Sequence, residues 1–252
     1  MKQTTVLLVV FLLMAAGGAA AQEARTYPYK TIVYMAEDNR MLAGPEGASR
    51  RVESTFRENL SGTVREYNAA GKLLRITQYA HMEAQLRLGP ETTYYENGEL
   101  RTKEDYVGNK RNGEFVVYYK DGKIKRRETY LKDERKTGEC FDPAGKPLPF
   151  FEYEVMPRYR GGGLVEMVRA IQQQVKYPAD ALRNQIEGKV YVSFAVSAAG
   201  ELEGVKIVKG LSPSLDAEVM RAVNTLKGFT PGTQDGVPVT VSFTVPITFA
   251  IQ

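Results

Sequence analysis

A short unit recurs four times in the middle of this 252-residue chain and constrains its fold more than any other feature. In each copy an aromatic residue is followed within four positions by a glycine, and a charged residue comes directly after that glycine; the copies are residues 67–73, 95–100, 119–124 and 141–148. Their glycines, Gly71, Gly98, Gly122 and Gly145, lie 27, 24 and 23 residues apart. An aromatic strand end, a turn that needs positive φ and a returning polar strand are typical of a β-hairpin. The repeat predicts an all-β array of stacked hairpins over residues 60–150.

Aromatic residues recur in the same rhythm. Tyr79, Tyr106 and Tyr130 each follow a turn glycine by eight residues, and we expect them to stack between successive hairpins. Cys140, the only cysteine, falls where earlier copies have tyrosine, and we expect it to be an ordinary sheet residue.

These units resemble the MORN-variant repeats. The resemblance implies an elongated antiparallel sheet that offers a binding surface instead of a reaction centre. Tyrosines interleaved with lysines and arginines would suit a glycan or an anionic ligand. Cross-strand packing of the same tyrosines is the alternative.

The N-terminus predicts export. Lys2 supplies a positive charge, residues 6–14 an apolar stretch and residues 19–21 a small-residue cleavage signal before Gln22, so residues 1–21 are predicted to be a signal peptide and the protein periplasmic. Because residues 4–21 carry no charge, the alternative is an uncleaved inner-membrane anchor with the rest of the chain facing the periplasm. The segment 22–59 has no predicted organisation.

Past Pro149 the pattern changes to alternating helices and strands, which predicts a domain boundary near residues 148–155. Hydrophobic periodicity predicts helices over residues 164–175, 181–185 and 212–227, and strands over residues 189–197 and 205–208. Residues 237–251 alternate apolar and polar side chains. They predict a single final strand spanning roughly 50 Å.

Several short motifs in this part, taken in order, are similar to those of one family. They include Tyr177-Pro178, Gly188, Pro231 and Pro246. Over residues 156–252 the chain resembles the C-terminal domain of TonB-type energy transducers. The resemblance implies two helices on a three-stranded antiparallel sheet, and hence an α+β chain. It also implies that the last strand pairs with the TonB box, a short extended segment of an outer-membrane transporter.

The final strand contains two prolines, Pro238 and Pro246. Residues of one parity direct their backbone groups to the same edge of a strand, and proline is tolerated where that edge is unpaired. We therefore expect the even-numbered edge to be free and to bind a partner strand by strand addition. The predicted docking segment is Val239, Thr240, Val241, Ser242, Phe243, Thr244 and Val245. The alternative is that this edge closes a homodimer.

No enzymatic site is expected. His81 is the only histidine, so a catalytic pair with Cys140 or a serine is implausible, and no ligand spacing for a metal occurs. The pair Glu104-Asp105 is expected at an exposed, solvated turn, and the glycines at 161–163 are expected to form a flexible joint. We also expect no cofactor and no nucleic-acid partner, because the net charge of +4 is spread along the chain.

Three functions remain open. The first is a TonB-like periplasmic protein that binds outer-membrane transporters, with or without energy coupling; the others are a non-transducing scaffold and a glycan-binding protein that uses the aromatic array. A mature protein that starts at Gln22 would exclude energy transduction, because no membrane anchor would remain.

Overall fold

The computed structural model describes residues 28–251, so the predicted signal peptide lies outside the described residues. These residues form two compact units, one ending at Phe150 and the other beginning at Phe151. Among the residues described, no helix is both long and apolar enough to cross a membrane.

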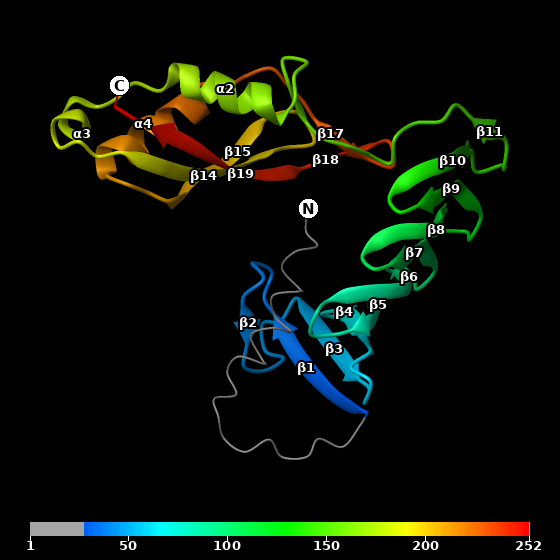
Figure 1. Ribbon diagram of the computed structural model, residues 1–252. Helices are drawn as coiled ribbons and strands as arrows, with labels where there is room; N and C mark the ends of the chain where they lie inside the picture. The colour runs from blue at the N-terminus through cyan, green and yellow to red at the C-terminus, as the bar shows by residue number, and fades with distance from the viewer. Residues whose placement is uncertain (1–27, 252) are drawn as a thin grey trace, which may run out of the picture. The chain divides into compact units, whose positions relative to one another are not determined.

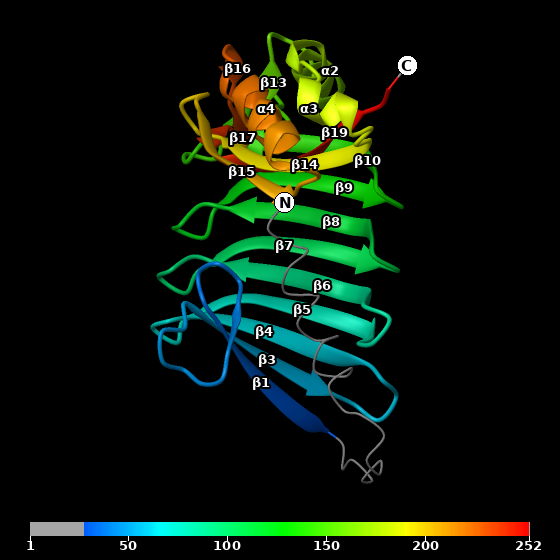
Figure 2. The same ribbon diagram turned by 90° about the vertical axis from the view of Figure 1, so that its left-hand side faces the viewer.

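The N-terminal unit is a single antiparallel sheet of eleven strands. Successive strands are neighbours from β3 to β11, while β1 lies between β3 and β2 (Figures 1 and 2). The strands are β1 (Tyr29–Met35), β2 (Met41–Leu42), β3 (Arg50–Phe56), β4 (Gly62–Asn68), β5 (Leu73–His81), β6 (Leu86–Tyr94), β7 (Leu100–Val107), β8 (Lys110–Tyr118), β9 (Ile124–Leu131), β10 (Glu134–Phe141) and β11 (Pro147–Leu148). The predicted all-β array is confirmed.

Glycine turns connect the strands as the repeat predicts. The φ angles of Gly71, Gly98, Gly122 and Gly145 are 75°, 90°, 82° and 83°, in the region that favours glycine. Each closes a short loop in which its amide bonds to the residue three positions before it, as Gly122 does to Tyr119. This hairpin connection, a turn followed by a left-handed residue, keeps the strand register fixed from one repeat to the next.

The sheet begins earlier than the repeat. Strands β1 to β3 come from the segment 22–59, for which the sequence predicts no organisation. They supply a small apolar cluster that closes this end of the sheet: Val33, Met35, Val52 and Phe56, together with Val64, Tyr79 and Met82.

One face of the array, which carries Tyr79, Tyr106 and Tyr130 and is called the inner face below, also carries charged side chains where aromatic stacking is predicted. Arg87 lies 3.7 Å from the ring centroid of Tyr106, and Arg111 lies 5.2 Å from that of Tyr130. The prediction of stacked tyrosines is wrong for Tyr106 and Tyr130, because an arginine from the neighbouring strand covers each ring.

Glutamates lie buried beside this face. Glu104 forms an ion pair with Arg111 and accepts a hydrogen bond of 2.7 Å from the Tyr106 hydroxyl. The prediction that Glu104-Asp105 lies at an exposed, solvated turn is therefore wrong. Both residues lie within β7, and Glu104 is buried on the same face as Tyr106, two residues away. Cys140 is a buried residue of β10, as predicted.

The C-terminal unit combines helices with small sheets. Its main sheet has the order β15-β14-β19 and is antiparallel. The elements are β12 (Glu154–Val155), β13 (Arg158–Tyr159), α2 (Leu164–Gln174), α3 (Ala179–Arg183), β14 (Gly188–Val196), β15 (Leu202–Lys209), α4 (Pro213–Asn224), β16 (Phe229–Thr230), β17 (Gly232–Gln234), β18 (Val237–Val239) and β19 (Val241–Phe249). The predicted α+β class, with two main helices on a three-stranded antiparallel sheet, is confirmed.

Helices α2 and α4 lie on one face of the main sheet (Figure 1). Their apolar faces pack against the even-numbered residues of β14 and the odd-numbered residues of β19. The core residues are Met167 and Ile171 of α2, Leu215, Val219, Ala222 and Val223 of α4, Val190, Val192, Phe194 and Val196 of β14, and Phe243, Val245, Ile247 and Phe249 of β19. Helix α4 starts as expected, with Pro213 in its first turn and Ser212 Oγ accepting from the Leu215 amide at 3.4 Å.

The final strand is divided at Thr240. Before it, β18 pairs with β17; after it, β19 pairs with β14. The prediction of a single strand over residues 237–251 is wrong, because the chain changes its pairing partner at Thr240, which has no partner in either sheet.

Candidate strand-docking edge

Strand β19 is an edge strand whose only strand neighbour among the described residues is β14. In this pairing Pro246 lies opposite Tyr191, and Val245 lies opposite Val192. Opposed residues of an antiparallel pair alternate between hydrogen-bonded and non-bonded types, and proline has no N–H to contribute. Odd-numbered residues of β19 therefore bond to β14, and even-numbered residues direct their backbone groups away from it.

The backbone of Thr248 demonstrates this direction. Its amide donates to Gln172 Oε1 at 3.1 Å, and its carbonyl accepts from Gln172 Nε2 at 2.7 Å. Gln172 belongs to α2, so both backbone groups of an even-numbered residue point to the edge opposite β14.

Strand β18 has the same parity. Asp235 and Gly236, with φ angles of 54° and 78°, form the turn of the β17–β18 hairpin. This tight turn makes the closing pair, Gln234 and Val237, the bonded type. Pro238 therefore falls on a non-bonded position opposite Thr233, and the even-numbered residues of β18 also face outward.

The unoccupied edge is short. From Pro238 to Pro246 the outward positions with an amide are Thr240, Ser242 and Thr244, all exposed. Within residues 28–251, no hydrogen bond outside the strand pairings involves the backbone of these three residues. Such an edge can accept another strand by backbone pairing.

In the β19 part of the predicted docking segment, odd-numbered residues direct their side chains toward the core and even-numbered residues direct theirs to the exposed face. The side chains of Phe243 and Val245 are buried under the helices, and that of Val241 is half-buried. The ring of Phe243 lies 5.8 Å from that of Phe194 in β14. These core contacts hold the backbone of β19 in place, so the edge is a rigid template. Val239 lies in β18 and pairs with Gly232.

The other motif residues support the fold. Tyr177 donates to the Ile186 carbonyl at 2.6 Å and packs edge-on against Phe249. Pro178 caps the short helix α3. A Cβ on Gly188 would lie 3.0 Å from Leu211, and Pro231 lies between β16 and β17.

The sheet face away from the helices carries lysines together with Glu203, which lies opposite Ala195 of β14, an arrangement that the sequence analysis missed. Lys206 and Lys209 of β15 lie opposite Ser193 and Tyr191 of β14. These lie in turn opposite Thr244 and Pro246 of β19. Alternation along β14 also places Lys189 on this face. That these lysines share one face could be inferred only once the pairing and register of the strands were known.

The C-terminal end of α2 is fixed by α4. Arg221 of α4 donates to the Gln174 carbonyl at 2.7 Å, and Glu218 accepts from the Lys176 amide at 2.7 Å. The hydrogen bond from Arg221 and that from the Lys176 amide hold the pKa of Glu218 below its ordinary value. The helix segment that reaches the edge of β19 is thus held in position.

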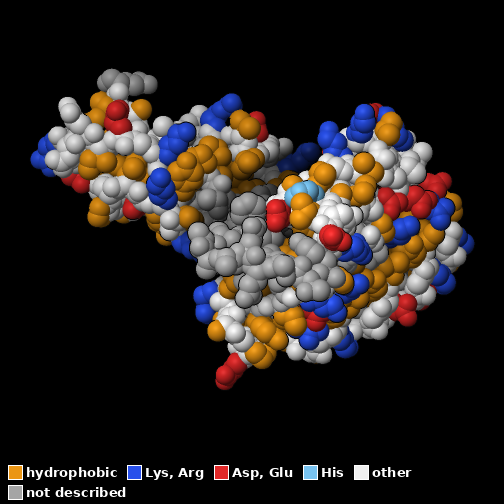
Figure 3. Space-filling view, turned by 60° about the horizontal axis from the view of Figure 1, so that its bottom comes forward, with side chains coloured by type: hydrophobic (Ala, Val, Ile, Leu, Met, Phe, Trp, Pro, Cys, Tyr) orange, Lys and Arg blue, Asp and Glu red, His pale blue; other side chains and the backbone are white. Residues whose placement is uncertain are grey.

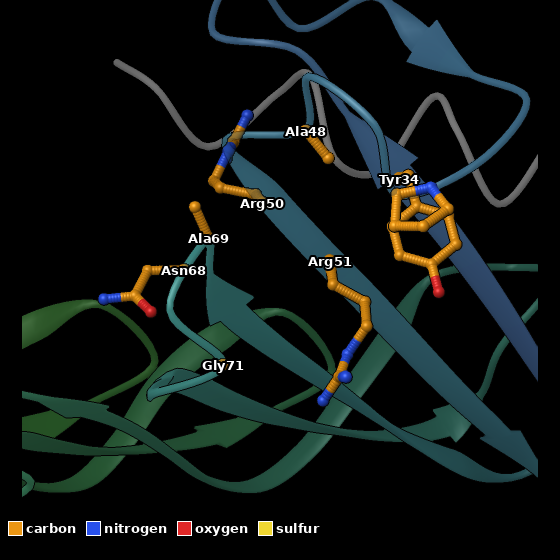
Figure 4. Close-up of a pocket in the computed structure, with 8 residues that line it drawn as sticks. Tyr34, Ala48, Arg50, Arg51, Asn68, Ala69 and Gly71 are labelled. Atoms are coloured by element: carbon orange, nitrogen blue, oxygen red, sulfur yellow. The ribbon is translucent and has the colours of Figure 1, made fainter.

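A cavity in the N-terminal unit shows no convergent chemistry. It has a volume of about 160 Å³ and is lined by Tyr34, Pro45, Ala48, Arg50, Arg51, Asn68, Ala69 and Gly71. Arg50 and Arg51 point in opposite directions (Figure 4), as neighbours on a strand must. Across the described part of the chain, no cluster of three histidine, cysteine or acidic side chains is placed to hold a metal ion.

Charged side chains of both signs are interspersed on the face of the molecule drawn in Figure 3. His81, the only imidazole, accepts a hydrogen bond from the Ala84 amide at 3.1 Å through Nδ1 and so supports a turn.

Residues 173–251 match the family model described as the Gram-negative bacterial TonB protein C-terminal domain. The C-terminal unit contains a TonB-type domain. Residues 87–107 and 111–132 match the model of the MORN repeat variant. The TonB match spans β14, β15 and β19, and therefore includes the unpaired edge described above.

Two solution structures of the Helicobacter pylori TonB C-terminal domain are similar to this TonB-type domain. One is 28% identical, with 34% of this chain and 91% of that chain covered and a TM-score of 0.29. The other is 27% identical, with 35% and 80% covered and the same TM-score. No curated protein matches the chain.

Proposed function

We propose that this chain is a TonB-like protein of the cell envelope that captures an extended segment of an outer-membrane transporter by adding it as a strand beside β19. The observation that supports this most directly is the unpaired edge at Ser242 and Thr244, bracketed by Pro238 and Pro246 on the same side. Backbone pairing would supply affinity, and the side chains beside it would supply selectivity.

The edge also restricts the kind of segment that fits. On the helix side, an added strand would extend the row formed by Phe243 and Val245, which favours apolar side chains. On the other side it would lie next to the exposed Ser242 and Thr244, which favours polar side chains. A segment with alternating apolar and polar residues satisfies both faces.

The proposal predicts that S242P abolishes capture. Proline removes an outward amide donor at the centre of the edge and leaves the bonds to β14 intact, so the fold should persist. S242A is the matched control, because it removes the hydroxyl and keeps the amide. We expect S242P to weaken binding of an immobilised peptide containing the TonB box of a transporter at least about tenfold, and S242A less than about twofold.

Equal binding by S242P and wild-type protein would exclude docking at this edge. The alternative occupant of this edge is the same edge of a second copy of the chain. In that event sedimentation would show a dimer of the wild-type protein that S242P converts to monomers, without peptide binding by either.

We propose a periplasmic location for both units. Energy coupling would further require residues 1–21 to be retained as an inner-membrane anchor, with the hairpin array as the spacer. If they are cleaved, the chain is a soluble scaffold that binds transporters or another envelope protein without transmitting force.

A further inference from the structure

The side chain of Gln172 makes at Thr248 the two hydrogen bonds that a neighbouring strand would make. Its amide donates to the Thr248 carbonyl at 2.7 Å and accepts from the Thr248 amide at 3.1 Å. A primary amide carries the same donor and acceptor as a peptide group. Gln172 therefore satisfies the N–H and C=O of Thr248 on the edge of β19 to which a partner strand would add.

The position of Gln172 is set by the fold. Its neighbour Ile171 is fully buried against the sheet, and the end of α2 is bonded to Arg221 and Glu218 of α4. The amide reaches the end of the edge from a fixed helix, so it does not depend on a loop closing over the strand.

The occupied position lies directly beyond the second proline. Ser242 and Thr244 each offer a donor and an acceptor, whereas Pro246 offers only its carbonyl. Thr248 would be the next complete position, and Gln172 already fills it. A partner strand that extends past Pro246 must displace the amide to gain further bonds.

We propose that Gln172 determines the length of the partner segment, because it competes for Thr248 with any strand that continues past Pro246. This rests on the proposed function for its biological role, although the competition itself is a property of the free protein. Segments that end at Pro246 gain nothing from the removal of Gln172, while longer segments gain one pair of hydrogen bonds.

The first test needs no partner. Amide hydrogen exchange of the full chain is measured by NMR for wild type, Q172A and Q173A. Gln173 is the matched control because it is the next exposed residue of α2 and has no bond to β19. In Q172A we expect Thr248 to exchange about three- to tenfold faster, the amount for one lost hydrogen bond, with Val245 unchanged. Unchanged exchange at Thr248 would overturn the proposal.

The second test uses two acetylated, amidated peptides of alternating threonine and valine, about five and about nine residues long, the lengths that pair with Thr240–Thr244 or reach Thr248. Q172A should raise the affinity of the longer peptide about three- to tenfold relative to Q173A, and that of the shorter peptide less than twofold. Q172E keeps the acceptor and loses the donor. Its affinity for the longer peptide should lie between those of Q173A and Q172A.

The two proposals fail in different ways. If both peptides bind, S242P prevents binding and Q172A has no length-dependent effect, the role of Gln172 is wrong and the docking edge stands. If neither peptide binds any variant while Thr248 exchanges faster in Q172A, Gln172 protects the Thr248 amide but docking at this edge is wrong.

Discussion

Glu104 lies buried on the inner face of the array beside a second carboxylate. Glu91 is its partner across β6 and β7, and both side chains are buried. Burial raises the pKa of Glu104, the charge of Glu91 adds to the increase, and Arg111 and the Tyr106 hydroxyl oppose it. The folded protein therefore holds a proton on Glu104 more tightly than the unfolded chain does.

This gives a pH dependence with a definite sign. A carboxyl group whose folded pKa is raised contributes stability at low pH that is lost as pH rises through the folded pKa. We expect the unfolding free energy of wild type relative to E104Q to fall from pH 4 to pH 7, as measured by urea denaturation. A relative stability that rises over this range would show that the ion pair with Arg111 outweighs burial.

At the scale of the element, each hairpin depends on a residue in the left-handed region. A Cβ at Gly122 would meet nothing within 4 Å, so only its φ of 82° requires glycine. The same requirement is met by Lys132 and Asp133 in the turn between β9 and β10. Some turns of the array therefore place glycine at the positive-φ position, and others place a different residue there.

We expect Gly122→Ala to destabilise the array by about 1 kcal/mol, because an alanine must adopt positive φ there. Gly44→Ala is the control, since Gly44 also has open space around its Cβ position but no positive φ. Thermal unfolding followed by tyrosine absorbance measures both. Equal effects of the two substitutions would contradict the role of φ.

Local patterns in the sequence were sufficient for the hairpins and for the helices around Ile171 and Val219, because turn glycines and hydrophobic periodicity act over a few residues. Strands β1 to β3 were missed because the turns that follow β1 and β3 place Asn39 and Leu60, and not glycine, at positive φ. The burial of Glu104 was missed because it depends on the ion pair with Arg111 of the neighbouring strand, and the sequence does not show that these two residues are adjacent.

The candidate docking edge and its extent between Pro238 and Pro246 were predicted from the parity of the two prolines, but the side chain that covers the backbone beyond Pro246 was not. Gln172 and Thr248 are 76 residues apart, and no spacing or composition signal connects them. Their contact follows from the packing of α2 on the sheet, which a sequence pattern does not determine.

At the scale of the whole molecule, the two units have separate hydrophobic cores, and their unfolding can be followed by two different spectroscopic signals. In the described part of the chain, helices occur only after Phe150. Most of the described tyrosines lie before it. Circular dichroism at the helix band therefore reports the C-terminal unit, while tyrosine absorbance reports mainly the array.

We expect Ile247→Ala to destabilise the C-terminal unit by about 2–5 kcal/mol, because its side chain is fully buried between the sheet and the helices. Denaturant titration should show an earlier transition at the helix band and an unchanged one in tyrosine absorbance. An equal shift of both signals would mean that the two units unfold together.

The contacts between successive hairpins repeat with the sequence. The hydroxyl of Tyr95 donates to the carbonyl of Tyr118, and that of Tyr119 donates to the carbonyl of Phe141. Lys72 and Lys123 likewise each reach a carbonyl in the following turn. These hairpins therefore contact the next one through the same kinds of hydrogen bond. Gene duplication or deletion of a whole repeat would preserve these contacts and change only the number of hairpins.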